Sequence, residues 1–326
     1  MREANVFPTY RGEMEYVCLG CQARYPIDEL HYTCPSCKGV FLLEDTGFSE
    51  LEKTPGQAWR DIFDLRAATK NPALRGIFRF YELMAPVVAE EHIVYLGEGN
   101  TPVTRSSPAL ERLVGQSMAF KNDGQNPSAS FKDRGMACAY SYLRHLVAKH
   151  DWDNVLTICA STGDTSAAAA LYAAYVGEPL TSVVLLPQGK VTAQQLSQPL
   201  GSGAKVLEIP GVFDDCMKVV EYLADHYRVA LLNSKNAWRI LGQESYAFAA
   251  AALEALARWW SNVPSRPRTS VSIFPLSASR PCNPWPRSAR HAWPSRPEGA
   301  FFFEQDKALA FADSHGLTLI GLPGSS

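Results

Sequence analysis

One lysine, Lys132, stands where its amine could do chemistry. It follows the turn-rich run KNDGQNPSASF and begins a predicted helix with Ser130 as its N-cap. A cation at a helix N-terminus opposes the macrodipole by about 0.3–1 kcal/mol, so lysine is disfavoured there unless its chemistry is needed. The positive helix end and Arg134 are expected to lower the pKa of the amine and make it a nucleophile toward a carbonyl. On the residues alone, a lysine paired with Asp133 over a helix cap is an open alternative.

Two further polar stretches follow predicted strands. The first, residues 160–165, reads ASTGDT and opens an alanine-rich helix, where backbone N–H groups can bind a carboxylate or phosphate. An ordinary Ser/Thr capping turn is the alternative. The second, residues 233–239, reads NSKNAWR, and its amides, hydroxyl and guanidinium suit a phosphate. A polar loop without a ligand is the alternative there.

Strands and helices must alternate to position these stretches. The predicted strands are residues 155–159, 182–186, 205–209 and 229–232. The predicted helices between and after them are residues 165–176, 192–199, 214–227 and 243–257. Such alternation predicts an α/β fold with a parallel sheet and right-handed crossovers, whose ligands bind beyond the carboxyl ends of the strands. A further turn, GEGNTPV at residues 97–103, follows a short strand predicted from His92 to Leu96.

Four of the eight cysteines form one cluster near the N-terminus: Cys18, Cys21, Cys34 and Cys37. Two C-x-x-C knuckles at this spacing present four thiolates tetrahedrally, which suits a structural zinc in a ribbon-like segment. Four free thiols are the alternative. The segment carries more acidic than basic side chains, which is the wrong sign for phosphate contacts, so a scaffold is favoured over nucleic-acid binding.

Length and composition bound the class of protein. The chain has 326 residues, of which 46% are hydrophobic, so it can bury a large core and hold more than one domain. Its net charge of −2 does not point to a nucleic-acid partner. No apolar run is long enough for a membrane span, and the N-terminus lacks a signal-peptide core, so a cytoplasmic location is expected.

The segment around Lys132 resembles a motif of known enzymes. NPSASFKDRG is similar to the N-P-T-G-S-F-K-D-R-G motif of the pyridoxal-phosphate enzymes related to the tryptophan synthase β chain, and within them to the threonine synthases. The resemblance covers about residues 90–257. Ser128 and Ala129 replace the Thr-Gly pair, and Ala129 is expected to need an ordinary backbone conformation.

The resemblance implies the rest of the site. It implies the type II fold of these enzymes, with parallel sheets and helices on both faces, and pyridoxal phosphate bound covalently by a catalytic lysine, Lys132. It implies conversion of O-phospho-L-homoserine and water to L-threonine and phosphate. Family members are often dimers, although the sequence leaves the oligomeric state open. The other implied residues are Phe131 and Asp164 for the cofactor and Thr101, Ser161, Thr162, Thr165, Asn233, Ser234 and Arg239 for the substrate, the last three for its phosphate.

The C-terminal part departs from the family. Residues 258–299 hold 8 of the chain's 22 prolines, a density that forbids a continued helix. Our hypothesis is that residues 258–326 are out of frame or foreign to the fold, after a ribbon over residues 1–50 and a catalytic region over 51–257. The family's glycine-rich loop for the cofactor phosphate has no counterpart there, so weak cofactor binding and weak or absent turnover are expected. The alternatives are another lyase of this fold, such as cysteate synthase, and a non-catalytic, zinc-stabilised remnant.

Overall fold

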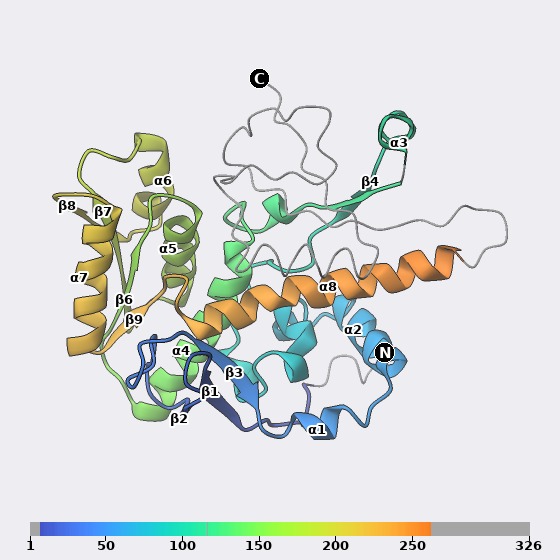
Figure 1. The fold of residues 1–326 in the computed structure, drawn as a ribbon, viewed down its shortest axis with the longest axis horizontal. Coiled ribbons are helices and arrows are strands. Elements are labelled where there is room, and N and C mark those ends of the chain that lie inside the picture. Colours follow the sequence, from blue (N-terminus) through green and yellow to red (C-terminus); the bar gives the residue numbers. More distant parts are fainter. Residues whose placement is uncertain (1–6, 116, 262–326) are drawn as a thin grey trace. The chain divides into compact units, whose positions relative to one another are not determined.

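A computed structural model describes residues 7–115 and 117–261 of the chain, drawn as the coloured ribbon in Figure 1. The chain forms two compact units. Of the described residues, the first unit comprises 7–102 and 123–253, and the second comprises 103–115, 117–122 and 254–261. The sheet predicted from the alternating pattern belongs to the first unit.

The first unit contains a four-stranded sheet in which all neighbouring strands are parallel. The strands are β6 (Val155–Ala160), β7 (Leu180–Pro187), β8 (Lys205–Ile209) and β9 (Val229–Leu231). Their order in the sheet is β8-β7-β6-β9, so the chain adds two strands on one side of β6 and then returns to its other side. The predicted parallel α/β fold is confirmed, and its strand order reverses between β6 and β9.

Helices cover both faces of this sheet (Figure 1). They are α5 (Asp164–Val176), α6 (Ala193–Gly201) and α7 (Phe213–His226). Ile158 packs with Val220 of α7, whereas the next residue in the strand, Cys159, belongs to the apolar cluster that contains Ala169 of α5. Successive side chains of a strand point to opposite faces, so a strand covered on both sides must be apolar throughout. This requirement explains why the strands of the sheet could be predicted from apolar runs in the sequence.

Two longer helices, α4 (Lys132–His150) and α8 (Ala237–Ser261), complete the first unit's frame. α4 agrees with the predicted helix at Lys132. α8 begins six residues before the predicted start at Gln243, which corrects the prediction. The Asn236 side chain explains the early start, because its Oδ1 accepts a hydrogen bond from the Arg239 amide at 3.1 Å, as in an N-cap. Arg239 therefore lies in the first turn of α8 and not in a loop.

The region from residue 48 to the turn at residue 97 is helical and contains no strand. Its elements are α1 (Phe48–Leu51), α2 (Gly56–Ala67) and the 3₁₀ helices η2 (Pro72–Leu74), η3 (Ile77–Leu83) and η4 (Glu90–His92). The strand predicted from His92 to Leu96 was wrong. The Val94 amide bonds to the Ser141 hydroxyl of α4 at 2.8 Å in place of a strand neighbour. This segment is thus anchored to the helix that begins with Lys132.

The cysteine-bearing segment is a three-stranded antiparallel ribbon. Its strands are β1 (Met14–Cys18), β2 (Arg24–Pro26) and β3 (Phe41–Asp45), with β1 in the centre. Cys18 and Phe41 belong to the same apolar cluster as the residues of α4 and α5. The Tyr32 hydroxyl also donates to the Val229 carbonyl of β9 at 3.0 Å. The ribbon therefore shares a core with the parallel sheet, and the predicted domain boundaries at residues 50 and 257 remain predictions.

The second unit contains a small antiparallel hairpin. β4 (Val103–Arg105) pairs with β5 (Ala119–Lys121), and α3 (Pro108–Val114) lies between them in the chain. α3 has the expected N-cap, since the Ser107 hydroxyl accepts from the Leu110 amide at 3.2 Å. Of the predicted tail, residues 258–326, only the end of α8 is described, and the hypothesis about residues 262–326 concerns a part outside the described residues.

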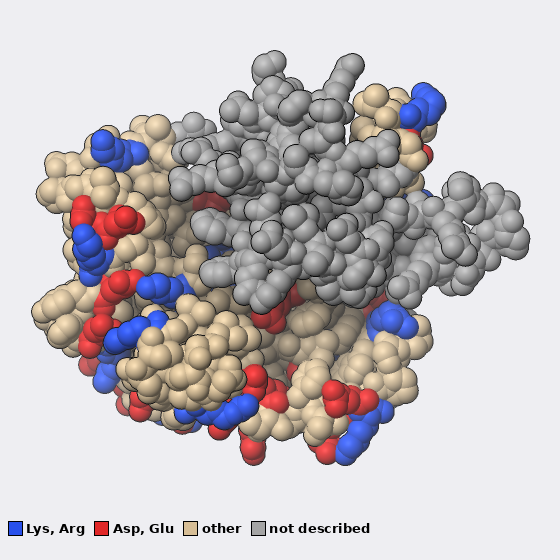
Figure 2. Space-filling model, in the orientation of Figure 1, with Lys and Arg blue, Asp and Glu red and all other residues tan. Residues whose placement is uncertain are grey.

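Charged side chains of both signs are interspersed over the described part of the visible face (Figure 2). Among the described residues, exposed charges also form ion pairs, such as Lys149 of α4 with Asp28 of the ribbon at 2.6 Å. Such exposed pairs contribute at most about 1 kcal/mol each. Within the described residues, no helix has the length and apolarity that a membrane crossing requires.

Candidate active site

The candidate site lies where the strand order of the parallel sheet reverses. β6 and β9 are neighbours, and each is followed at its carboxyl end by one of the two polar stretches singled out in the sequence. Crevices at such a reversal are the usual ligand sites of open parallel sheets, because the loops on either side diverge there. The fold therefore brings together residues 160–165 and 233–239, which are distant in the chain.

Lys132 is the first residue of α4, and its side chain is half-buried. Its Nζ lies 3.9 Å from the centre of the Phe131 ring and makes no ion pair within the described residues. Burial is the main reason that its pKa falls to about 8, the charge of Arg239 lowers it further, and Asp164 opposes the shift. The predicted direction is therefore correct, and Asp164 contacts Ser130, two residues before Lys132 in the chain.

The predicted cause of that shift needs correction. Arg134 was expected to act on the amine, but it is fully buried in an ion pair with Asp123, with Nε 2.9 Å from Oδ2. Its charge is therefore balanced. Asp133 does not pair with Lys132 either, because its Oδ2 accepts from the Ser128 amide at 2.8 Å.

Ser130 connects the starts of α4 and α5. Its hydroxyl accepts from the Lys132 amide at 3.3 Å and donates to Oδ2 of Asp164, the first residue of α5, at 3.0 Å. The helix boundary falls at Phe131, one residue later than the predicted N-cap. Ser130 nevertheless satisfies an amide at the helix start, as a cap would.

The loop between β6 and α5 is half-buried and built from small residues, Ser161, Thr162 and Gly163. The Ser161 hydroxyl accepts from the Gly163 amide at 3.3 Å, which forms a serine turn just before α5, and no side chain caps the helix itself. Thr165 follows Asp164 in the first turn of α5. A turn of this kind does not preclude a ligand, since the positive end of α5 still faces the loop and favours an anion.

The second stretch is mostly committed to internal hydrogen bonds. The Asn233 side chain donates to the Ala160 carbonyl at 2.7 Å and accepts from the Ala160 amide at 3.0 Å. It thereby ties this stretch to the end of β6. Ser234 is exposed. Arg239 is 1% exposed, and its Nη1 donates to the Leu232 carbonyl at 2.6 Å, while its Nε has no hydrogen-bond partner among the described residues. An unpartnered buried guanidinium N–H is unfavourable unless an acceptor arrives.

Thr101 belongs to a buried network beside the start of α4. Its hydroxyl donates to Asp123 Oδ1 at 2.5 Å, and Arg134 Nη2 contacts the same hydroxyl at 3.2 Å. Arg134 Nη2 also donates to the Gly99 carbonyl at 2.8 Å, which holds the turn at residues 97–101 in place. The predicted contact of Thr101 with substrate remains a prediction, because the structure shows its hydroxyl proton used by Asp123.

Ala129 has a backbone conformation that the sequence did not predict. Its φ is +60°, in the left-handed region that favours glycine, whereas an ordinary conformation was expected. The turn explains the difference, because the Ala129 amide closes back on the Asn126 carbonyl at 2.8 Å, just before α4 begins. The position keeps the conformation that the family's glycine would adopt without cost.

Two asparagines that hold the site were not assigned from the sequence. Asn126 accepts from the Gly99 amide at 3.0 Å and donates to the Asp123 carbonyl at 2.8 Å. Asn236 donates to the Leu231 carbonyl at 2.8 Å, besides capping α8. The signal for Asn236 was its position three residues before Arg239, which is the spacing of an N-cap pair. Asn126 carried the general turn preference of asparagine and a match to the first residue of the family motif, but neither assigned it a contact.

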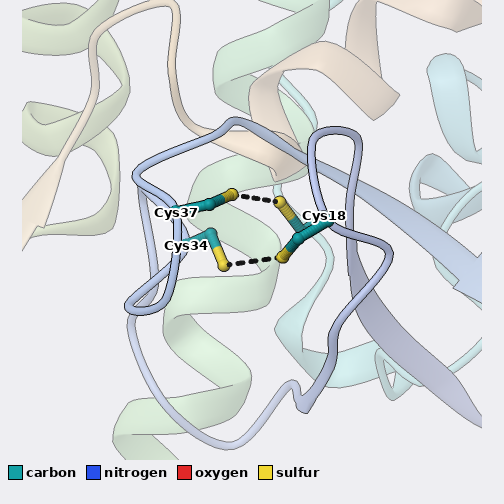
Figure 3. Close-up of side chains that lie close together, drawn as sticks. Cys18, Cys34 and Cys37 are labelled. Atoms are coloured by element: carbon teal, nitrogen blue, oxygen red, sulfur yellow. Dashed lines mark hydrogen bonds between the residues drawn. The ribbon is translucent and has the colours of Figure 1, made fainter.

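The ribbon brings its four cysteines together (Figure 3). The sulfurs of Cys18 and Cys37 are 3.3 Å apart and those of Cys21 and Cys34 are 3.6 Å apart, with all four within 4.8 Å of one another. These distances are too long for disulfides. Sulfurs around a tetrahedral zinc lie about 3.8 Å apart when each bond is about 2.3 Å, so the cluster has the dimensions of a metal site.

Comparison with known proteins adds to this geometry. The family described as "Pyridoxal-phosphate dependent enzyme" matches residues 94–263. Threonine synthase of Methanocaldococcus jannaschii is 35% identical over 235 residues, covering 71% of this chain and 52% of that protein. Threonine synthase of a Synechocystis species is 41% identical over 192 residues, covering 58% and 48%. A solved threonine synthase from Brucella melitensis has 19% identity and a TM-score of 0.48, covering 78% of this chain and 53% of that one. The chain spans about half the length of the curated relatives it matches.

Proposed function

The chain belongs to the family of pyridoxal-phosphate-dependent enzymes, and from that premise we propose that it is a threonine-synthase-like lyase. Its reaction would convert O-phospho-L-homoserine and water to L-threonine and phosphate. The observation that carries the proposal is the Lys132 amine, half-buried, free of an ion pair among the described residues, and placed where the strand order reverses. The similarity to curated threonine synthases supports the choice of substrate.

The residues at the site fit the aldehyde end of pyridoxal phosphate. An amine with a pKa of about 8 is partly neutral near neutral pH, and only the neutral amine attacks an aldehyde. Lys132 would hold the cofactor covalently, with Phe131 and Asp164 beside it. When bound, the cofactor supplies an electron sink for charge that develops at the substrate's Cα. The part of the chain beyond residue 261, where the sequence lacks the family's glycine-rich pattern, lies outside the described residues.

The chain's own groups would do the remaining work. The Lys132 amine would move protons at Cα and Cβ of the bound substrate, a task suited to a base whose pKa lies near the working pH. The loop Ser161–Thr165 would bind the substrate carboxylate at the positive end of α5. Water adds at Cβ after phosphate leaves from Cγ, so the enzyme must hold the phosphate end of the substrate firmly.

Arg239 is the proposed anchor for that phosphate, with Ser234 beside it in the chain. Its Nε lacks a partner among the described residues although the side chain is buried, so a phosphate oxygen would satisfy it. Because Arg239 also lowers the pKa of Lys132, binding a dianion next to it would raise that pKa again. Substrate binding would thus make Lys132 a stronger base when proton transfer begins.

We also propose that Cys18, Cys21, Cys34 and Cys37 hold a structural zinc. The set offers four thiolates and leaves no open position for substrate, which is the pattern of a structural site. The ribbon packs into the main core, so the ion would stabilise the scaffold and not take part in the reaction. Purified protein should contain about one zinc per chain by mass spectrometry of the metal, and Cys21→Ser should lower both the zinc content and the thermal midpoint. Wild-type protein prepared with zinc present that still lacks the metal would contradict the proposal.

The catalytic proposal is tested by mixing the protein with pyridoxal phosphate, reducing with borohydride and locating the modified residue by peptide mass. We expect a yellow complex and modification at Lys132, with none in Lys132→Ala. Lys149→Ala is the matched control, because Lys149 lies on the same helix but is exposed and paired with Asp28. The midpoint of the same titration measures whether cofactor binding is as weak as the sequence predicts.

Phosphate release then tests the substrate. O-phospho-L-homoserine should release phosphate and yield threonine, and O-phospho-L-serine, one methylene shorter, should not. Arg239→Ala should lower kcat/KM by about 100-fold or more, since it removes a buried charged partner of the phosphate. Release of phosphate from phosphoserine alone would favour another lyase of this fold. No release of phosphate from either substrate would favour the alternative of a non-catalytic remnant.

A further inference from the structure

A residue of the cysteine ribbon reaches the helix that carries Arg239. Tyr16 lies in the central strand β1, and its hydroxyl accepts a hydrogen bond from Trp238 Nε1 at 2.9 Å. Tyr16 is 1% exposed and Trp238 is 2% exposed. A hydrogen bond shielded to this degree is costly to lose, because the indole N–H has no water to turn to.

Trp238 is held on its other side by the helix that begins with Lys132. Its ring stacks on that of Tyr142 in α4, with centroids 3.6 Å apart and planes 13° from parallel. At this distance the two rings lie face to face, so the contact fixes the plane of the Trp238 ring against α4. Trp238 thus has its orientation fixed from both the ribbon and α4, and the next residue in the chain is Arg239.

A close helix crossing sets the separation of α4 and α8, and Trp238 is one of the contacts that orient the first turn of α8, together with Asn236. A Cβ on Gly242 of α8 would lie only 2.7 Å from Cys138 Cβ of α4, and a Cβ on Gly135 would lie 2.9 Å from the Arg239 carbonyl oxygen. Two glycines therefore let the backbones touch near the starts of both helices. At such a contact no side chain of the glycine resists rotation of one helix against the other. A second point of attachment therefore helps to orient the first turn of α8.

We propose that Tyr16 is a positioning residue for Arg239. By accepting the Trp238 hydrogen bond it fixes the first turn of α8, and thereby the direction in which the Arg239 guanidinium points. The remaining contacts of that guanidinium come from the chain just before α8, since Nη1 donates to the Leu232 carbonyl. The proposal rests on the phosphate-binding role proposed above for Arg239.

Tyr16→Phe tests this proposal with the smallest change, because it removes only the hydroxyl. Tyr32→Phe is the matched control: Tyr32 is also a buried ribbon tyrosine, but its hydroxyl bonds to the Val229 carbonyl of β9 and not to α8. We expect Tyr16→Phe to weaken inhibition by inorganic phosphate by about threefold to tenfold, as a lost buried hydrogen bond predicts, and Tyr32→Phe to leave it within about twofold. Equal weakening in the two variants would assign the effect to a loosened ribbon and overturn the proposal.

A double-mutant cycle tests whether the effect runs through Trp238. Trp238→Phe should weaken phosphate inhibition at least as much as Tyr16→Phe, and the double variant should be no weaker than Trp238→Phe alone. Additive losses would show that Tyr16 acts by another route. Unchanged phosphate inhibition in Tyr16→Phe would also overturn the proposal.

A second readout decides the matter if the chain does not turn over phosphohomoserine. The pH midpoint for borohydride trapping of pyridoxal phosphate on Lys132 reports the nearby Arg239 charge without any need for turnover. A displaced guanidinium should move that midpoint upward in Tyr16→Phe and leave it in place in Tyr32→Phe. No movement in Tyr16→Phe would overturn the positioning role, whereas loss of turnover in the wild type alone would overturn only the proposed reaction.

Discussion

α4 and α5 begin next to each other at the site, yet they begin with opposite charges. α5 starts with Asp164, an anion at the positive end of a helix, which the macrodipole favours. α4 starts with Lys132, a cation in the equivalent position, which the same dipole disfavours. The Ser130 hydroxyl joins the two starts. The difference agrees with the proposed role of Lys132: one helix start favours stability, and the other gives up stability to hold the amine that we propose is reactive.

The largest effect is expected from Lys132→Met, which removes the amine and keeps an apolar side chain of similar length. Covalent trapping of pyridoxal phosphate should be lost completely. Stability at pH 7 should stay the same or rise by up to about 1 kcal/mol, because the variant removes a cation from the positive end of α4. Urea unfolding at pH 7, followed by circular dichroism, measures the second effect.

The pH dependence of that gain has a definite sign. The pKa of Lys132 is about 8 in the folded protein and ordinarily near 10.5, so below pH 8 the lysine is charged in both states and the folded state bears the cost. As the pH rises from about 8 to 10.5 the folded protein releases this proton first, so wild-type stability rises relative to Lys132→Met. The exposed Lys149→Met serves as control. A variant of Lys132 that is less stable than wild type by more than about 1 kcal/mol at pH 7 would break the comparison.

A smaller effect is expected from the partner helix. The charge of Asp164 raises the pKa of Lys132 against the influence of burial, so Asp164→Asn should lower that pKa further. The absorbance of bound pyridoxal phosphate should then change at a different pH from that of the wild type, because Asp164 is proposed to lie beside the cofactor. A spectrophotometric titration measures the shift.

Asp153→Asn is the control for this titration, since Asp153 is an exposed carboxylate just before β6, at the opposite end of that strand from the site. It should leave the titration in place. Identical curves for Asp164→Asn and the wild type would remove Asp164 from the site.

The parts of the fold that could be predicted are those where burial leaves a mark in the sequence. The mostly buried strands β6, β7 and β9 differ from the predicted bounds by at most two residues at either end. The edge strand at residues 205–209 also has the predicted bounds, although most of its side chains are exposed. The start of α8 was missed because its first turn contains Trp238 and Arg239 within a polar run, and such a run is typical of a loop. Tyr16 was missed because its partner lies 222 residues away, and no local pattern reports a contact of that range.

Within the site, too, local features could be predicted from the sequence and long-range contacts could not. The motif around Lys132 correctly indicated a lowered pKa, but it could not show that Arg239, and not Arg134, shares in causing it. Only the packing reveals that Asp123 neutralises Arg134. Charge effects depend on which partners are buried together, and the order of residues in the chain does not state this.

The smallest predicted effect concerns the turn that delivers Lys132 to its place. Ala129 has a φ of +60°, which costs an alanine about 1–2 kcal/mol relative to its ordinary conformations and costs a glycine almost nothing. Ala129→Gly should therefore stabilise the protein, and the greater freedom of glycine in the unfolded chain reduces the net gain to about 0.5–1 kcal/mol. Thermal unfolding measures the gain.

Asp151→Gly provides the matched comparison at the other end of α4. Asp151 also has a left-handed backbone, with a φ of +51°, but a short polar side chain tolerates this conformation better than a methyl group does. Asp151→Gly should therefore stabilise the protein less than Ala129→Gly does. If Ala129→Gly gives no gain, the turn before Lys132 is not strained by its alanine. α4 would then give up stability only through the charge of its first residue, and the contrast with α5 would reduce to electrostatics alone.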